Sequence, residues 1–194
     1  KHRPEPRGLW TQQELAVFMQ RTQDHWLHPL FVFLLSSGCR IGEALALRWE
    51  DVDLQARAVR VGRTLHRLRG QWVFTEPKTR TAVRTVSLPP EAVAALRKQK
   101  AQQAEWRLRS GQQWQDWGLV FTGRRGQPLS QATVNHALAR ECRRIGVPVL
   151  SAHSLRHLHA SLLLAEGLPL PEVSRRLGHA NTQVTAAIYS HALN

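Results

Sequence analysis

The chain of 194 residues is long enough for one large domain or two small ones, and for a substantial hydrophobic core. Its 27 Lys and Arg exceed its 14 Asp and Glu, and the formal net charge of +13 indicates a polyanionic partner. Two cysteines without a CxxC pair exclude a disulfide framework, and no apolar run approaches the ~20 residues that cross a membrane. We therefore expect a soluble, cytoplasmic protein with two buried free thiols.

The first quarter of the chain predicts three helices. Thr11 and Glu14 have the spacing of a capping box, which opens the first helix. The expected ranges of the first two helices are about 12–21 and 25–37. Gly38 is suited to the left-handed residue that ends the second helix, and a third helix begins at Arg40. Because a cation at a helix N-terminus does not stabilise the helix, Arg40 has room for a binding role.

The middle of the chain changes to β-branched and alternating residues. Between Ala58 and Leu88, three short stretches rich in Val, Thr and aromatic residues are separated by turn residues. The turns are expected near Arg69-Gly70 and Lys78-Thr79. This pattern predicts a small three-stranded antiparallel sheet.

The remainder of the chain is mostly helical in pattern. The expected helices cover about 90–109, 130–146, 154–166 and 171–178, and a last one begins near Thr182 and carries Tyr189. Ser130 is a typical N-cap, and Gly167 and Gly178 are typical helix stops. A short strand is expected at 119–121. The predicted fold class is α+β, mainly α-helical, with one small three-stranded antiparallel sheet.

Four residues in the last third suit phosphodiester chemistry: His153, Arg156, His179 and Tyr189. A tyrosine hydroxyl can attack phosphorus, an imidazole can move a proton, and a guanidinium can bind two phosphate oxygens at once. Tyr189 is the single tyrosine of the chain, so no second phenol competes as nucleophile. His153 and Arg156 are three positions apart on one helix face, about 4.5 Å along the axis, and could hold one phosphate jointly.

These residues stand in motifs that resemble the catalytic signature of the tyrosine recombinases, the phage integrase family. The motifs are His153-Ser154-Leu155-Arg156-His157, Leu177-Gly178-His179 and Tyr189-Ser190-His191. The stretch Ser37-Gly38-Cys39-Arg40 is similar to the first arginine box of the family. Lys78, within Glu76-Pro77-Lys78-Thr79, matches its β-turn lysine. The resemblance spans about Trp10 to His191.

The resemblance implies six catalytic residues, which are Arg40, Lys78, His153, Arg156, His179 and Tyr189. Tyr189 would attack a DNA phosphate, giving a 3′-phosphotyrosyl enzyme and a free 5′ hydroxyl. The two arginines and His179 would stabilise the phosphate oxygens, and His153 would accept the tyrosine proton. Lys78 is the candidate acid, because a lysine beside cations such as Arg80 and Arg84 can donate a proton. One phosphoester replaces another, so no cofactor or metal is expected, and no zinc or magnesium motif is found in the sequence.

Further expectations follow for partners and domains. The resemblance implies double-stranded DNA and identical subunits in a synaptic tetramer as partners, accessory DNA-bending proteins in addition, and no membrane. Residues 1–9 are interpreted as a linker remnant of a missing N-terminal core-binding domain, and residues 10–194 as the catalytic domain. We therefore expect weakened DNA affinity. The expected location is the cytoplasm, nucleoid-associated, for a bacterial or phage-encoded protein.

Several alternatives remain open at the level of sequence. A type IB topoisomerase would use the same chemistry to relax DNA as a monomer, and an inactive DNA-binding module would keep the fold alone. Among recombinases, the amino-acid sequence of the C-terminal motifs is closer to that of integrases than to that of chromosome-dimer resolvases. Glu43, one turn after Arg40, is either an acceptor that orients a catalytic cation or a carboxylate on the helix surface.

Overall fold

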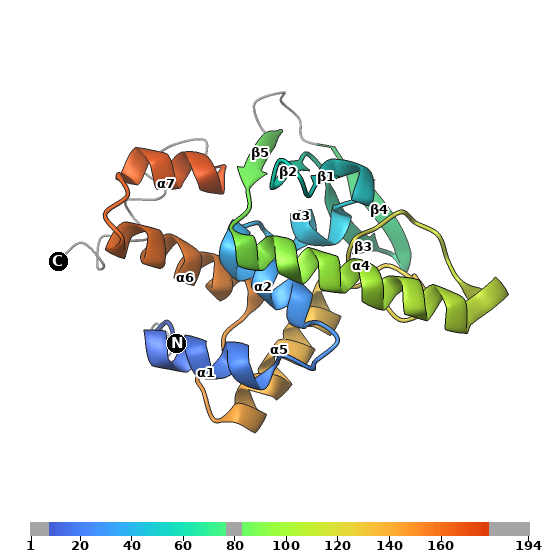
Figure 1. The fold of residues 1–194 in the computed structure, drawn as a ribbon, viewed down its shortest axis with the longest axis horizontal. Helices are drawn as coiled ribbons and strands as arrows, with labels where there is room; N and C mark the ends of the chain where they lie inside the picture. The colour runs from blue at the N-terminus through green and yellow to red at the C-terminus, as the bar shows by residue number, and fades with distance from the viewer. Residues whose placement is uncertain (1–7, 77–82, 179–194) are drawn as a thin grey trace.

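The computed structural model describes residues 8–76 and 83–178, which form a mainly helical domain (Figure 1). The α-helices of this part are α1 (Gln12–Arg21), α2 (His28–Ser37), α3 (Ile41–Ala46), α4 (Pro90–Ser110), α5 (Gln131–Ile145), α6 (Ala152–Ala165) and α7 (Leu170–Leu177). The strands are β1 (Val52–Asp53), β2 (Ala58–Val61), β3 (Thr64–Leu68), β4 (Gln71–Thr75) and β5 (Arg84–Ser87). Two short 3-10 helices are η1 (Trp49–Asp51) and η3 (Gly111–Gln113). The expected α+β, mainly helical class is confirmed.

The first two helices agree with the sequence except at one boundary. Thr11 and Glu14 form the expected capping box: the Glu14 N–H donates to Thr11 Oγ1 (3.2 Å), and the Thr11 N–H donates to Glu14 Oε2 (2.7 Å). Helix α2 begins at His28 and not near residue 25. Pro29 explains the difference, because proline is tolerated in the first turn of a helix but removes a hydrogen bond from its interior. The expected helix was therefore too long at its start.

The strands form two small antiparallel sheets, so the expectation of one sheet of three consecutive strands was wrong. One sheet has the order β1-β2-β5, and the β3-β4 hairpin is the other. Val59 pairs with Val86 in the first sheet, and Leu65 pairs with Phe74 in the second. The chain leaves the first sheet at Gly62, which has no side chain to pack in a strand. A three-stranded antiparallel sheet is thus present, but with different members.

The turns around these strands agree with the sequence where they are described. Arg69 and Gly70 form the hairpin turn between β3 and β4, with φ of 50° and 84°. The turn expected at Lys78-Thr79 lies outside the described residues. The strand expected at 119–121 is reduced to an isolated bridge between Leu119 and Arg48. The helix expected from about Thr182 lies outside the described residues as well.

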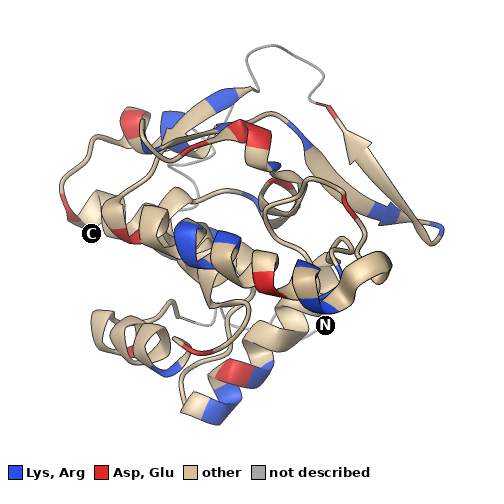
Figure 2. Ribbon diagram, turned by 45° about the vertical axis from the view of Figure 1, so that its right-hand side comes forward, with Lys and Arg blue, Asp and Glu red and all other residues tan. Residues whose placement is uncertain are grey.

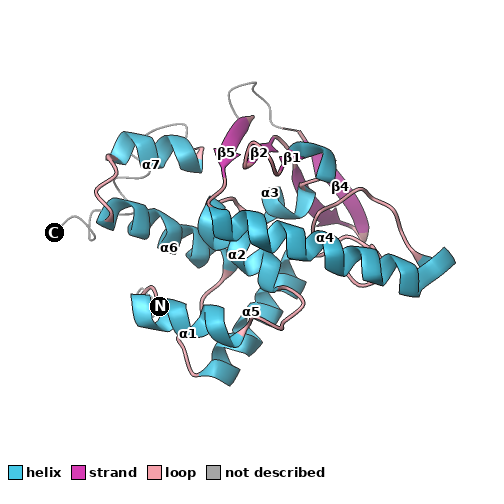
Figure 3. Ribbon diagram, viewed as in Figure 1, coloured by secondary structure: helices cyan, strands magenta, loops and turns pink. Residues whose placement is uncertain are grey.

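Helix α2 is the centre of the helical part. Eight of its ten residues are buried, and it contacts α3, α4 and α6. Figure 3 shows the strands gathered on one side of the domain, with α1 and α5 on the other side of α2. Ala160 of α6 packs with Val173 and Leu177 of α7 in a second, smaller apolar cluster. This cluster holds α7 against α6 and so places the end of α7 near the end of α2.

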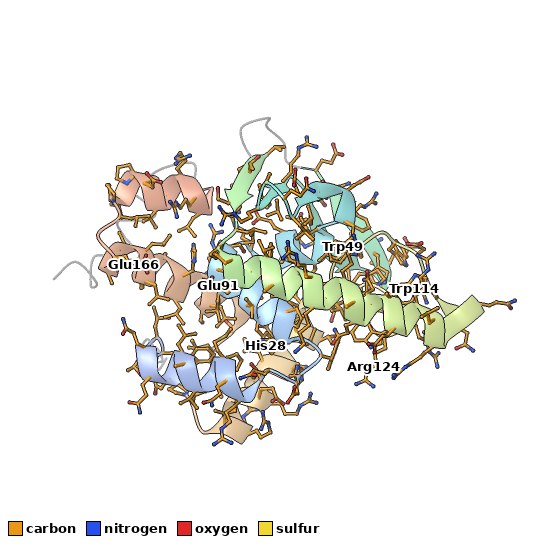
Figure 4. All side chains as sticks on the ribbon, viewed as in Figure 1. His28, Trp49, Glu91, Trp114, Arg124 and Glu166 are labelled. Atoms are coloured by element: carbon orange, nitrogen blue, oxygen red, sulfur yellow. The ribbon has the colours of Figure 1, made fainter. Side chains whose placement is uncertain are left out.

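The C-terminal half of α4 is covered by tryptophans. Trp49 Nε1 donates to Gln103 Oε1 (2.7 Å), and Trp106 meets Trp26 edge-on with 6.0 Å between ring centroids. Trp49 and Trp114 are labelled beside α4 in Figure 4 and line one pocket there. These aromatic rings therefore serve packing in the part of the chain that the structure describes.

The expectations drawn from cysteine content, charge and hydropathy can be compared with the fold. Cys39 and Cys142 are buried free thiols, as expected, and burial raises the pKa of both. Lys and Arg occur on helices and strands throughout the described residues and not at one end alone (Figure 2). Within residues 8–76 and 83–178, no helix has the length and apolar character to cross a membrane.

Candidate active site

The turn between α2 and α3 places Arg40 directly before the first residue of α3. Gly38 ends α2 with a left-handed φ of 62°. A Cβ at this position would lie 2.4 Å from Cδ2 of His159 and 3.0 Å from Cδ2 of Leu177. Both the φ and the close packing therefore require glycine. Because His159 is in α6 and Leu177 ends α7, these two helices fix the turn that carries Arg40.

The Arg40 side chain reaches the surface and is 48% exposed. Its Nη1 donates to Glu43 Oε1 (3.1 Å), while Glu43 Oε2 accepts from the Arg40 backbone N–H (2.9 Å). Glu43 therefore supplies the acceptor and the negative charge that favour a helix N-terminus. Since a guanidinium has five N–H donors, the exposed part of Arg40 can still bind an anion.

Glu43 is 8% exposed, which resolves its two interpretations in favour of a buried acceptor. Besides Arg40 it binds Arg84, whose Nη1 donates to Oε1 (3.0 Å) and whose Nη2 donates to Oε2 (2.8 Å). Burial acts to raise the pKa of Glu43, but hydrogen bonds and charge from Arg84, followed by those from Arg40, lower it. Glu43 is thus an ionised carboxylate shared by two guanidinium groups.

Sequence reasoning considered Arg84 only as a cation near Lys78 and missed its contact with Glu43. A signal was present in the alternation of β5. Side chains two apart in a strand point to the same face, and Val86 is buried. The first residue of β5 is therefore expected to point inward as well, and the Arg84 side chain is indeed only 13% exposed.

Arg156 is buried in α6, with 3% of its surface exposed. Its Nη1 donates to the Gly38 carbonyl (2.6 Å), 118 positions away, and its Nη2 donates to the Leu177 carbonyl (2.6 Å). These carbonyls lie at the C-terminal ends of α2 and α7, where the helix dipole favours a cation. Arg156 therefore joins three helices beside the turn that carries Arg40.

The charge of Arg156 is only partly compensated. Burial, followed by the charge of Arg40, lowers the pKa of Arg156 to about 10. Among the described residues, its hydrogen bonds go to two neutral carbonyls. An anion held by Arg40 and Arg156 together would offset both the burial and the repulsion between the two guanidinium groups.

His153 is exposed in the first turn of α6, whose N-cap is Ser151. Its ring meets the His157 ring edge-on, with 4.4 Å between centroids. Burial of part of the ring lowers the pKa of His153, and the charges of Arg156 and Arg40 lower it further. A neutral imidazole is therefore favoured at neutral pH, and such a group can accept a proton.

Three of the six predicted site residues are thus described: Arg40, His153 and Arg156 lie close enough for each arginine to lower the pKa of the histidine. The other three, Lys78, His179 and Tyr189, lie outside the described residues. For residues 8–76 and 83–178, no three His, Cys, Asp or Glu side chains gather as a metal site would require.

The described residues form a mainly helical α+β domain in which Arg40 and Arg156 are both held at the turn between α2 and α3. The model of the phage integrase family matches residues 11–194. The chain belongs to this family, the tyrosine recombinases.

Curated relatives agree with this membership. The chain is 29% identical to a XerC-like tyrosine recombinase of Caldanaerobacter subterraneus subsp. tengcongensis, over 95% of this chain and 50% of the relative. It is 33% identical to an integrase of Streptomyces ambofaciens, over 84% of this chain and 44% of the relative. The ICEBs1 integrase of Bacillus subtilis is 28% identical over 94% of this chain and 50% of the relative. The chain thus spans about half the length of the curated relatives that it matches.

Solved structures share the fold. The Tn1549 transposon integrase, solved in complex with circular intermediate DNA, superposes with a TM-score of 0.82 at 22% identity, over 95% of this chain and 63% of that chain. The XerA recombinase gives a TM-score of 0.77 at 22% identity, over 98% of this chain and 64% of that chain. At this level of identity the likeness supports the fold.

Proposed function

We propose that the chain is the catalytic domain of a site-specific, integrase-like DNA recombinase. It cleaves and rejoins strands by transesterification, without a metal, through a 3′-phosphotyrosyl intermediate. The observation that carries the proposal is the placement of half-exposed Arg40 and buried Arg156 close to His153. Membership of the phage integrase family and the net charge of +13 support it further.

In the proposed reaction, Tyr189 Oη forms a bond to the scissile phosphorus while the bond from phosphorus to the 5′ oxygen breaks. The tyrosine proton passes to His153, and Lys78 gives a proton to the leaving 5′ oxygen. Rejoining is the reverse sequence with a new 5′ hydroxyl. The number of phosphoester bonds is conserved, so the reaction needs no external energy source.

The two arginines and His179 would stabilise the transition state. Negative charge builds on the nonbridging oxygens as phosphorus becomes five-coordinate, and donors fixed beforehand stabilise that charge with little reorganisation. Arg156 meets this condition, because two carbonyls already hold its guanidinium. Arg40 meets it through Glu43, which is itself held by Arg84.

The proposal includes double-stranded DNA and identical subunits as partners, in a synaptic tetramer in which each subunit cuts one strand. Relatives were solved on DNA: the XerH recombinase was bound to difH substrate, and a lambda integrase dimer was bound to a core site. Within this proposal residues 10–194 are the catalytic domain, and residues 1–9 are a linker to a core-binding domain. The location is the bacterial cytoplasm.

The test is a nicked suicide duplex, in which the strand beyond the scissile phosphate is short enough to diffuse away after cleavage. Its sequence is selected from random duplexes by binding to the chain. We expect an SDS-resistant protein–DNA adduct with the unchanged chain and none with Tyr189→Phe. An adduct with both proteins would exclude Tyr189 as nucleophile, and an adduct with neither would exclude the activity. Relaxation of supercoiled DNA without strand exchange would instead indicate a topoisomerase.

A further inference from the structure

Arg84 is a largely buried cation that is not among the six residues assigned to the proposed reaction. It is the first residue of β5, where it pairs with Val61 of β2, and its side chain is 13% exposed. It lies 41 positions from Glu43 in the sequence, yet both guanidinium nitrogens at its tip donate to the Glu43 carboxylate at 2.8 and 3.0 Å. Such a two-point contact fixes the plane of the carboxylate as well as its position.

The contact determines what Glu43 can offer to Arg40. Each carboxylate oxygen accepts one bond from Arg84 and one from Arg40: Oε1 accepts from both side chains, and Oε2 accepts from Arg84 and from the Arg40 backbone N–H. The carboxylate is therefore a bridge between the two arginines. A rotation of Glu43 would change both its contact with the Arg40 guanidinium and its cap on α3.

Arg84 also contacts the end of α7. A Cβ built on Gly178 would lie 3.0 Å from Cδ and Nη1 of Arg84 and 3.1 Å from its Cζ. The backbone of Gly178, with φ of 67°, thus packs directly on the Arg84 side chain. Leu177, the residue before it, supplies a carbonyl that holds Arg156. One side chain of β5 therefore contacts the carboxylate that supports Arg40 and the residue that follows the carbonyl holding Arg156.

We propose that Arg84 is a positioning residue for DNA cleavage, acting through Glu43 to set the guanidinium of Arg40 against the scissile phosphate. This inference rests on the proposed function. Arg84 does not itself touch the phosphate. Its two terminal nitrogens both donate to the Glu43 carboxylate, which Arg84 shares with Arg40.

The test variant is Arg84→Lys, which keeps the charge but cannot contact both carboxylate oxygens in the same plane. The matched control is Arg144→Lys, because Arg144 of α5 also faces a buried glutamate, with 2.7 Å between Nη2 and Oε2 of Glu141. Denaturation in urea reports the stability of each variant. We expect Arg84→Lys to lower the single-turnover cleavage rate constant by about 10- to 100-fold, by analogy with the loss found when groups that orient metal ligands are changed. Arg144→Lys should leave this rate constant unchanged.

A double-mutant cycle separates positioning from a general structural effect. In the background of Arg40→Ala, Arg84→Lys should lower cleavage by less than about 2-fold, because the group that Arg84 positions is gone. Equal losses in both backgrounds, or full activity of Arg84→Lys alone, would overturn the inference. No adduct with the unchanged chain would overturn the proposed function and this inference with it.

A second pair of variants covers the case in which Arg84→Lys does not fold. Glu43→Gln changes the bridging carboxylate itself. Glu141→Gln is its control, because the two glutamates are almost equally exposed, at 8% for Glu43 and 7% for Glu141. Glu43→Gln should lower cleavage in the unchanged background and add little to Arg40→Ala. Equal effects of Glu43→Gln and Glu141→Gln on cleavage would contradict the positioning of Arg40 through this carboxylate.

Discussion

The two arginines of the candidate site are held in opposite ways. Arg40 is half-exposed and is supported by a carboxylate, whereas Arg156 is buried and is held by two backbone carbonyls. Glu43 neutralises part of the charge of Arg40, while the pKa of Arg156 falls to about 10 through burial and the charge of Arg40. The two carbonyls fix the position of the Arg156 guanidinium but do not neutralise its charge. We therefore expect Arg156 to attract an anion more strongly, and the exposed side chain of Arg40 to adjust its position more easily.

The largest effect should come from Arg156→Ala. Loss of one donor to the transition state lowers a rate constant by about 100- to 1000-fold, so single-turnover cleavage should fall by that amount. The Gly38 and Leu177 carbonyls lose their shared donor as well, which should reduce the free energy of unfolding by about 1–3 kcal/mol. Cleavage assays and urea denaturation measure the two losses. Unchanged stability would mean that the carbonyl contacts do not support the fold.

Arg40→Ala should separate activity from stability. We expect a loss in cleavage of about 100-fold, because the second donor to the phosphate is removed. The free energy of unfolding should change by less than about 1 kcal/mol, since the side chain is half-exposed and Glu43 keeps its contact with Arg84. The same two assays apply. A loss of stability as large as that of Arg156→Ala would abolish the distinction between the two arginines.

Gly38→Ala tests the turn that both arginines share. A left-handed φ costs an alanine about 1 kcal/mol, and the new methyl group would also collide with His159, which adds about 1–3 kcal/mol. Gly146→Ala is the control, because Gly146 has a φ of 86° but no atom within 4 Å of the new Cβ. Thermal denaturation should show the larger loss for Gly38→Ala, with reduced cleavage. Equal losses for the two variants would show that packing around Gly38 adds nothing.

The smallest expected effect is on the titration of His153. Its pKa should lie below the ordinary value of about 6.5. Arg40→Gln should raise that pKa, because a positive charge that disfavours protonation is removed. Cleavage should fall as the pH falls through the pKa of His153, and the fall should begin at higher pH in Arg40→Gln.

Proton NMR of the His153 ring measures this shift directly. His159 is an internal control, because burial lowers its pKa to about 4 and the smaller influences on that pKa come from Leu35, Arg156 and Arg176. A His153 titration that is the same in both proteins would show that Arg40 does not act on this imidazole.

Local patterns in the sequence were sufficient for most bounds of the described helices and for the position of Arg40. The capping box at Thr11 and the helix stop at Gly38 depend on neighbours only a few residues away. The start of α2 was misplaced because Pro29 was not weighed against the helical pattern around it.

Long-range contacts account for what the sequence did not predict. Strand β5 could pair with either sheet, and only the packed structure selects β2. The carbonyls that hold Arg156 carry no sequence signature, because every residue has one. The contact between Arg84 and Glu43 joins residues 41 positions apart. Alternation in β5 indicates that the Arg84 side chain points inward but does not indicate its partner. The catalytic roles assigned to all six site residues stay predictions.

The small apolar cluster between α6 and α7 has a kinetic consequence. Val173 and Leu177 pack on Ala160 in a cluster separate from the main core, so we expect local opening of α7 to cost less free energy than unfolding of the whole domain. Each such opening withdraws the Leu177 carbonyl from Arg156. Under the proposed function, the fraction of molecules ready for cleavage would follow this local equilibrium, and the observed rate would be the intrinsic rate multiplied by that fraction.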